Sequence, residues 1–160
     1  MNDQREILIE EITEITDSVR KLIFELDAEL SSHYNEDQRH GLNVNELVEP
    51  RVRFFVISVD GVAAACGGVK IFEDFGEVKR MFVLAPFRGQ GLADLVIQRI
   101  RDEIVRSGLN RLMLETGVHS LAAIRFYERL GFVRCEAFGQ YLKMAPSEIV
   151  TSLFFEKTLN

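Results

Sequence analysis

The sequence predicts an α+β protein whose central sheet of about six to seven mostly antiparallel strands is flanked by about three to four helices. Runs rich in β-branched and aromatic residues follow one another closely between residues 52 and 83, separated by turn signals, as in antiparallel hairpins. Longer segments, such as residues 92–106, place apolar residues at helical spacing. The predicted order of elements is β-α-β-β-β-α-β-α-β-β.

The first third of the chain is predicted to form a strand, a helix and a polar loop. Residues 7–12 are a strand candidate, and Asp17 is a suitable N-cap for a helix whose apolar stripe ends at Leu30. Residues 31–41 are polar and are expected to form a loop that borders a binding site. A short helical piece is expected over residues 43–48.

Three successive strands are predicted next. Residues 52–59 and 62–72 flank an Asp-Gly pair, which is a strong hairpin signal. A second turn over residues 73–76 leads into a third strand at 77–83. We therefore expect these strands to be antiparallel neighbours.

A glycine-containing turn follows the third strand and precedes the longest amphipathic helix. Gly89 and Gly91 stand immediately before the apolar stripe that begins at Leu92. Free amide groups and the positive end of the helix dipole meet at a helix N-terminus, which makes it a site for phosphate or pyrophosphate. The sequence thus predicts an anion-binding turn here.

The remainder is predicted to complete the sheet. The expected elements are a buried strand at 111–116, a helix capped by Ser120 and ended by Gly131, a strand at 132–138, a loop over 139–151 and a strand at 153–157.

Composition excludes several classes of function. The chain has 160 residues and a formal charge of −6, so we expect one domain over residues 1–160 and no nucleic-acid partner, which would require a basic face. Cys66 and Cys135 lie in apolar runs without metal-type spacing, so no metal is expected. Neither a signal peptide nor a membrane-spanning run is apparent, and a cytoplasmic location is expected.

Two segments resemble the signatures of the GNAT acetyltransferase superfamily, in particular a small acidic bacterial branch. Residues 83–93 contain Arg88-Gly89-Gln90-Gly91-Leu92-Ala93 and are similar to its acyl-CoA loop. Residues 123–132, Ala-Ile-Arg-Phe-Tyr-Glu-Arg-Leu-Gly-Phe, are similar to its second signature. One glycine-rich loop alone is weak evidence, but two signatures in the right order are strong. The resemblance implies a GNAT-like fold with a splayed strand pair at the acyl-CoA site.

The resemblance also implies a set of residues that bind acetyl-CoA as cosubstrate. The strand before the loop would hold the pantetheine arm, and the loop amides would hold the pyrophosphate. The implied cofactor-binding residues are Phe82, Val83, Arg88, Gly89, Gln90, Gly91, Leu92, Ala93, Ser120 and Phe126. Ser120 stands where the family commonly has an Asn, so a hydroxyl would replace an amide there.

Two residues match catalytic positions of the family. Tyr127 matches the acid that protonates the leaving thiolate. The alternative is a tyrosine that only packs in the hydrophobic core. Glu77 matches the carboxylate that serves as base in some members, and its alternative is a solvent-exposed glutamate at a strand start.

The sequence indicates fewer residues for binding the acceptor amine. Glu115 follows the buried strand and is a candidate for binding an ammonium group or for pairing with Lys79 or Arg80. Tyr34, His40 and Tyr141 are predicted on loops that border the acceptor pocket.

The predicted function is transfer of an acetyl group from acetyl-CoA to a small-molecule or amino-acid-like amine. One alternative is an acyl-CoA-binding sensor with little catalysis. Another is a nucleotide binder, which would need a βαβ unit with parallel strands. Edge strands near the C-terminus are compatible with a homodimer.

Overall fold

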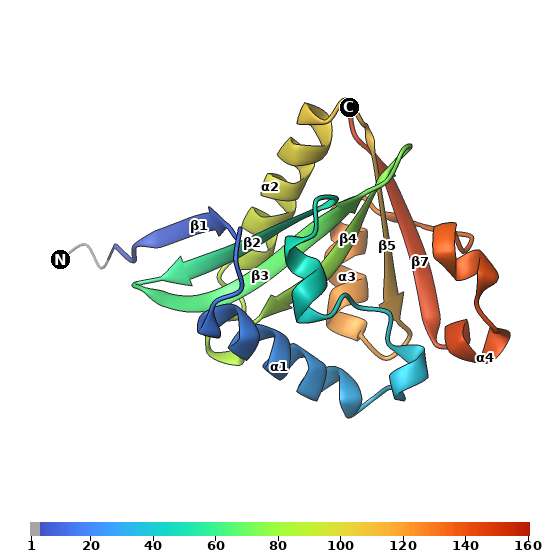
Figure 1. Cartoon of the computed structure of the whole chain (residues 1–160), viewed down its shortest axis with the longest axis horizontal. Helices are drawn as coiled ribbons and strands as arrows, with labels where there is room; N and C mark the ends of the chain where they lie inside the picture. Colours follow the sequence, from blue (N-terminus) through green and yellow to red (C-terminus); the bar gives the residue numbers. More distant parts are fainter. Residues whose placement is uncertain (1–3) are drawn as a thin grey trace.

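A seven-stranded sheet forms the centre of the protein (Figure 1). The computed structural model describes residues 4–160. The strand order is β1-β2-β3-β4-β5-β7-β6, and all neighbours are antiparallel except β4 and β5. The strands are β1 (Ile7–Glu11), β2 (Val52–Val59), β3 (Val62–Ile71), β4 (Gly76–Val83), β5 (Arg111–Gly117), β6 (Val133–Cys135) and β7 (Ser152–Thr158).

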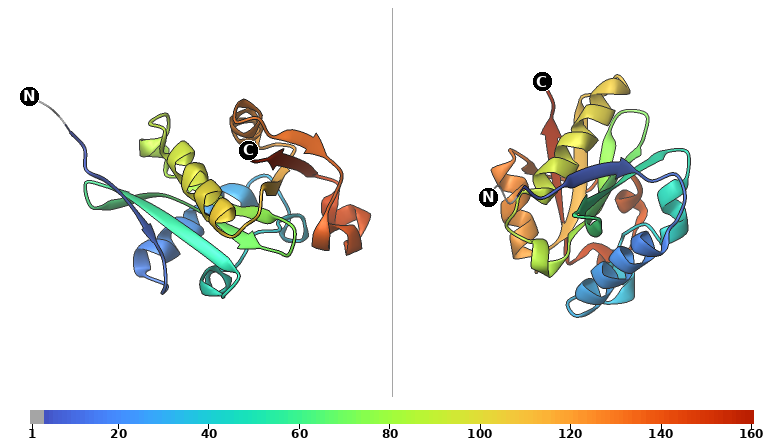
Figure 2. Two further views of the ribbon diagram at one scale, coloured as in Figure 1. Left: turned by 90° about the horizontal axis from the view of Figure 1, so that it is seen from above. Right: turned by 90° about the vertical axis from the view of Figure 1, so that its left-hand side faces the viewer.

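Helices cover both faces of this sheet. In Figure 2, α1 lies on one face, and α2 lies on the other face together with α3. The α-helices are α1 (Asp17–Ser31), α2 (Leu92–Arg106), α3 (Leu121–Arg129) and α4 (Pro146–Ile149). Four short 3-10 helices are η1 (Glu36–Gln38), η2 (Val44–Val48), η3 (Ala85–Phe87) and η4 (Gly139–Lys143).

The two faces have separate hydrophobic cores because successive strand residues point to opposite sides. On β2, Phe55 packs in the core beneath α2, whereas its neighbour Phe54 packs in the core beneath α1. The apolar stripe of α2 places Val96 and Ile100 fully inside the first core. The predicted order of strands and long helices is confirmed.

Strands β4 and β5 separate soon after they meet. They pair in parallel at Gly76 with Leu112 and at Glu77 with Met113, and then diverge (Figure 1). The splayed strand pair expected from the family resemblance is therefore present. The unit β4-α2-β5 is parallel, as in nucleotide binders, but here it belongs to a largely antiparallel sheet.

A β-bulge interrupts β4 where it runs beside this gap. Gly68 pairs with Lys79 and Cys66 pairs with Phe82, so the single residue Gly67 stands opposite two residues of β4. Arg80 has a φ of 57°, in the left-handed region that non-glycine residues rarely adopt. A Cβ on Gly67 would lie 2.2 Å from Sδ of Met81 and 2.8 Å from Cγ1 of Val96, so a larger residue opposite the bulge would displace these side chains.

The structure corrects three local predictions. Thr16, not Asp17, caps α1, and its Oγ1 accepts from the Val19 amide at 3.2 Å. The strand predicted at 132–138 is only Val133–Cys135 long. The loop predicted at 139–151 contains η4 and α4, because Tyr141 packs against Phe138 and Phe154 in a third hydrophobic cluster.

We predict that Ile100→Ala lowers the free energy of unfolding by about 2–5 kcal/mol, because it leaves a cavity in the core beneath α2. Urea denaturation measures the change. Val105→Ala in the same helix is the matched control, because Val105 is 54% exposed, and it should change stability by less than about 1 kcal/mol. Equal losses would contradict the assignment of the buried face.

Candidate active site

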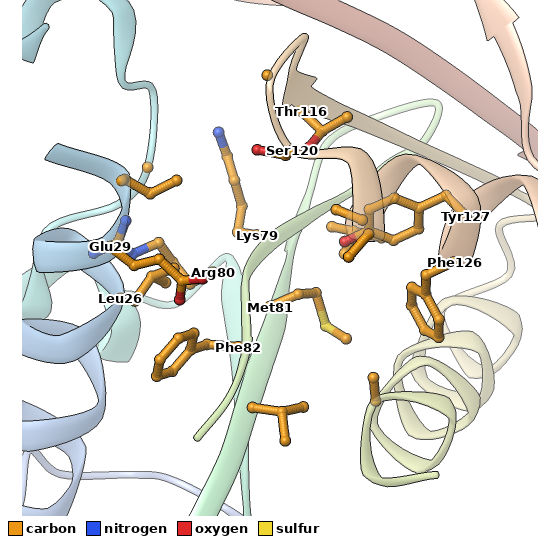
Figure 3. Close-up of a pocket in the computed structure, with 18 of the residues that line it drawn as sticks. Leu26, Glu29, Lys79, Arg80, Met81, Phe82, Thr116, Ser120, Phe126 and Tyr127 are labelled. Carbon is orange, nitrogen blue, oxygen red and sulfur yellow. The ribbon is translucent and has the colours of Figure 1, made fainter. Parts of the chain in front are cut away.

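A cleft of about 710 Å³ occupies the gap between the separated strands β4 and β5. Figure 3 shows residues from α1 on one side of β4 and residues from α3 on the other. The residues that line it include Leu26, Leu30, Tyr34, Glu77, Lys79, Arg80, Phe82, Val83, Arg88, Gly89, Gly91, Leu92, Ala93, Glu115, Ser120, Phe126, Tyr127 and Tyr141. The cleft therefore touches both faces of the sheet.

The predicted anion-binding turn lies at one end of this cleft. Gly89 and Gly91 have φ values of 78° and 80°, and Gly91 immediately precedes the first residue of α2. No atom lies within 4 Å of a Cβ built on either glycine, so backbone conformation rather than crowding requires glycine there. Gln90 does not line the cleft, and its Oε1 accepts from Arg5 Nη1 at 2.7 Å.

The Arg88 side chain is held at the rim of the cleft. Its Nε donates to the carbonyl of Val83 at 2.9 Å, and its Nη2 donates to Oε2 of Glu29 on α1 at 2.9 Å. Both partners of this ion pair are about half exposed, so it contributes little to stability. Together with the bond to Val83, this ion pair holds the guanidinium of Arg88 beside the end of β4.

The edge of β4 that faces the cleft has no partner strand beyond Glu77 among the residues described. Phe82 and Val83 lie on this stretch and line the cleft, with Phe82 packed toward α1 and Val83 toward α2. An extended chain laid along this edge would find free backbone donors and acceptors. The geometry suits an elongated ligand.

Tyr127 of α3 reaches the cleft from the opposite side. Its ring packs edge-on against Phe126 and Phe132, with centroids 5.2 and 5.5 Å away. Its hydroxyl hydrogen-bonds to none of residues 4–160. Burial, and to a lesser degree the charge of Glu115, raises the pKa of Tyr127 above its usual value. The phenol therefore remains protonated at neutral pH and has a proton to donate.

Glu77 belongs to a buried polar cluster rather than to the solvent-exposed start of a strand. Tyr141 donates its hydroxyl proton to Glu77 Oε2 at 2.5 Å, and Lys79 Nζ is 3.0 Å from the same oxygen. Lys79 also donates to the hydroxyl of Tyr141 and to the carbonyl of His40, both at 3.0 Å. Two donors of this ammonium are therefore used in hydrogen bonds, and its charge is paired with Glu77.

Tyr141 is buried and lines the cleft, and it belongs to η4, where the sequence predicted a loop that borders the acceptor pocket. Burial and the adjacent carboxylate of Glu77 raise the pKa of Tyr141, so its hydroxyl stays a donor. His40 does not line the cleft, because its ring turns toward α4 and its Nε2 lies 2.8 Å from the carbonyl oxygen of Glu148. Its contribution is the backbone carbonyl that holds Lys79.

Glu115 lies on β5 just beyond the point where the strands separate. Ser152 donates to its Oε2 at 2.5 Å, and neither Lys79 nor Arg80 forms an ion pair with it. Burial, assisted by the negative charge of Glu77, raises the pKa of Glu115, while the Ser152 hydrogen bond opposes that effect. This carboxyl can therefore exchange a proton closer to neutral pH than an ordinary glutamate.

Ser120 stands at the start of α3, but its side chain does not cap that helix. Its Oγ lies 3.0 Å from the hydroxyl of Tyr34, which also accepts from the amide of His119 at 2.9 Å. Tyr34 is buried and lies over Gly117, where a Cβ would come within 1.9 Å of the tyrosine hydroxyl. The polar loop after α1 is thus joined to the β5-α3 connection.

Sequence reasoning missed two groups that line the cleft. Arg80 and Lys79 had been considered only as ion-pair partners of Glu115. The apolar wall from α1, Leu26 and Leu30, had been assigned only to a helical stripe. A signal was available, because adjacent cations inside a predicted buried strand require partners or a ligand.

Among residues 4–160, no helix is long and apolar enough to cross a membrane. Within the same range, no three His, Cys, Asp or Glu side chains are grouped to hold a metal ion.

An open sheet split between two parallel strands, with a glycine turn and a helix N-terminus at the split, defines the acyl-CoA N-acyltransferase class of fold. The model of the acetyltransferase (GNAT) family matches residues 14–132 of this chain. The chain belongs to the GNAT acetyltransferase family, and it is an acetyl-CoA-dependent N-acetyltransferase by class.

Individual proteins agree with this assignment. The chain is 38% identical to an IAA acetyltransferase of Azospirillum brasilense over 91% of this chain and 93% of the relative. It resembles a Klebsiella pneumoniae subsp. pneumoniae MGH 78578 crystal structure assigned to the acyl-CoA N-acyltransferases, with a TM-score of 0.80, 30% identity and coverage of 96% and 98%. The yncA structure of Salmonella typhimurium, solved with acetyl-CoA, has the same fold at a TM-score of 0.65, 18% identity and coverage of 96% and 94%.

We predict a pH-dependent stability difference between the wild type and Glu115→Gln. Because the folded-state pKa of Glu115 lies above its unfolded value near 4.5, the wild type loses stability from this group as pH rises through that interval. The glutamine variant does not titrate, so its relative stability should increase from pH 4 to pH 8. Chemical denaturation at several pH values measures this, and a constant difference would contradict the raised pKa.

Proposed function

We propose that this protein transfers the acetyl group of acetyl-CoA to the amine of a small molecule. The observation that carries the proposal is the hydroxyl of Tyr127, a buried residue that lines the cleft; this hydroxyl is protonated and has no hydrogen-bond partner among residues 4–160. It faces a cleft that also includes an anion-binding helix N-terminus and an open strand edge. These are the parts that a thioester of CoA requires.

The cosubstrate would lie along the cleft. The amides from Arg88 to Ala93 would hold the pyrophosphate, and the free edge of β4 at Phe82 and Val83 would pair with the pantetheine arm. Phe126 would supply apolar contact. Ser120 is the weakest member of the set, because Tyr34 already engages its hydroxyl.

The chemistry is direct attack on the thioester. The amine nitrogen forms a bond to the acetyl carbonyl carbon, and the resulting tetrahedral intermediate expels CoA as a thiolate. We assign Tyr127 as the acid that protonates this sulfur. The amine must lose a proton, so a base is also required.

We assign Glu115 as the base that takes this proton from the amine, directly or through water. The pKa of Glu115 is raised by burial, which makes it a stronger base than an ordinary glutamate, and no lysine or arginine side chain pairs with it in the described structure. Glu77, the base expected from the family resemblance, already forms an ion pair with Lys79 and accepts from Tyr141. Its proposed role is to hold Lys79 and Tyr141 at the wall of the acceptor pocket.

The remaining organisation is proposed from the same features. Residues 1–160 form a single catalytic domain. Strand β6 is an edge strand of the sheet, and we place a homodimer contact at its free side. Light scattering of the purified protein measures its molecular mass and so tests whether it is a dimer in solution.

A thiol-release assay with acetyl-CoA and a panel of amines tests the function. The panel contains polyamines, aromatic amines, amino acids and a peptide, together with IAA because the Azospirillum relative is named for it. We expect turnover with a subset of the small molecules. Tight CoA binding without turnover on any acceptor would instead favour an acyl-CoA-binding module.

Tyr127→Phe should lower kcat by about 10²-fold to 10⁴-fold, because the variant lacks the proton donor to the leaving thiolate. Its affinity for acetyl-CoA should stay within about twofold, since the ring and its packing are kept. Steady-state kinetics and calorimetry measure the two quantities. An unchanged kcat would remove Tyr127 from the role of acid.

Gly91→Asp should weaken CoA binding by more than about tenfold, because a carboxylate would stand at the proposed pyrophosphate site. Gly91→Asn is the matched control, since asparagine has nearly the same shape, tolerates a positive φ and is neutral. Neither side chain should disrupt the fold, because the space around the position is open. If both variants bound CoA equally well, the turn would not be the pyrophosphate site.

A further inference from the structure

Arg80 is a buried arginine in the cleft whose donors are mostly unused. Its side chain is only 5% exposed, and its Nη2 donates to Oδ1 of Asp27 at 2.7 Å. Its Nε is fully buried without a partner, and its Nη1 donates to no group within residues 4–160. Unlike Nε, Nη1 is not fully buried, so this guanidinium retains a donor that an anionic ligand can use.

The backbone is strained at the position that supplies this side chain. Arg80 adopts a φ of 57°, a conformation that disfavours any residue with a side chain. Without the bulge, consecutive residues would point to opposite faces of the sheet. With it, Lys79 and Arg80 both lie on the α1 side of β4, and Met81 lies on the α2 side (Figure 3).

The loop after α1 is shaped around the guanidinium. A Cβ on Gly41 would lie 2.3 Å from Nη1 of Arg80 and 2.9 Å from its Cδ. Any larger residue at this position would push the arginine away. Arg80 is therefore seated by the strand that carries it and by the segment opposite.

Two charged groups in the part of the cleft where the acceptor would bind are available to a ligand: Glu115 and Arg80. Lys79 donates to two oxygens, and its charge is balanced by Glu77. Glu115 has no lysine or arginine partner within residues 4–160, whereas Arg80 has only the half-exposed Asp27. A ligand with an ammonium and a carboxylate complements this pair of groups.

We propose that Arg80 binds the carboxylate of the acceptor, so that the substrate class is amino acids and related amines that carry a carboxylate. This inference rests on the proposed N-acetyltransferase function. The ammonium is directed to Glu115, and the carboxylate is held by Nη1 of Arg80. Leu26, Leu30 and Phe82 line the same side of the cleft and suit an apolar side chain.

The test compares acceptors that differ only in the carboxylate: leucine with isopentylamine, and phenylalanine with 2-phenylethylamine. In the wild type, kcat/KM should favour the amino acid of each pair. In Arg80→Met, this preference should fall by about tenfold to a hundredfold, mostly through KM. Methionine is subject to a similar backbone strain, and a general loss of folding would lower both acceptors of a pair equally.

Asp27→Asn is the control variant. Its amide oxygen can accept the same hydrogen bond, and the competing negative charge is removed. The preference for the amino acid should be kept or increased. Loss of the preference in this variant would show that Arg80 is not the determinant and would overturn the proposal.

A binding measurement separates this inference from the proposed function. Calorimetry in the presence of CoA compares N-acetyl-leucine with N-isopentylacetamide, in the wild type and in Arg80→Met. Carboxylate-dependent binding that is lost in the variant, without turnover on any amine, would support the inference and contradict the function. Equal turnover on both members of each acceptor pair would overturn the inference and leave the function standing.

Discussion

The site depends on the separation of β4 from β5 after two paired residues. On its outer side each strand is held by a neighbour, β3 for β4 and β7 for β5, so the sheet tolerates a gap at its centre. The gap frees one backbone edge of β4, gives α2 an accessible N-terminus and leaves room for Tyr127 of α3. If the strands were paired along their full length, all three features would be closed to a ligand.

Buried charge determines the opposite wall of the cleft. Desolvating a carboxylate and an ammonium is unfavourable unless each finds partners, and Glu77 and Lys79 satisfy one another with the help of Tyr141. Tyr141, which completes this polar cluster, lies on η4 after Phe138. Its ring also fills the third hydrophobic cluster.

Local patterns predicted much of the fold. The hairpin at the Asp-Gly pair, the amphipathic α2 and the glycine turn are encoded by neighbouring residues, so they could be recognised without the tertiary structure. The short β6 and the 3-10 helix around Tyr141 could not, because both depend on packing against distant residues. The cap of α1 was misplaced by one residue, since Thr16 and Asp17 are both good capping residues.

The sequence by itself determined the fold class and the enzyme family, because both signatures are continuous stretches whose residue types have local physical requirements. The tertiary structure decided which polar groups meet. Tyr34 joined Ser120, Tyr141 joined Glu77 and Lys79, and Arg80 turned toward Asp27. These contacts link residues that lie far apart in the chain, and the bulge in β4 changes the direction of a side chain that strand alternation would place on the other face.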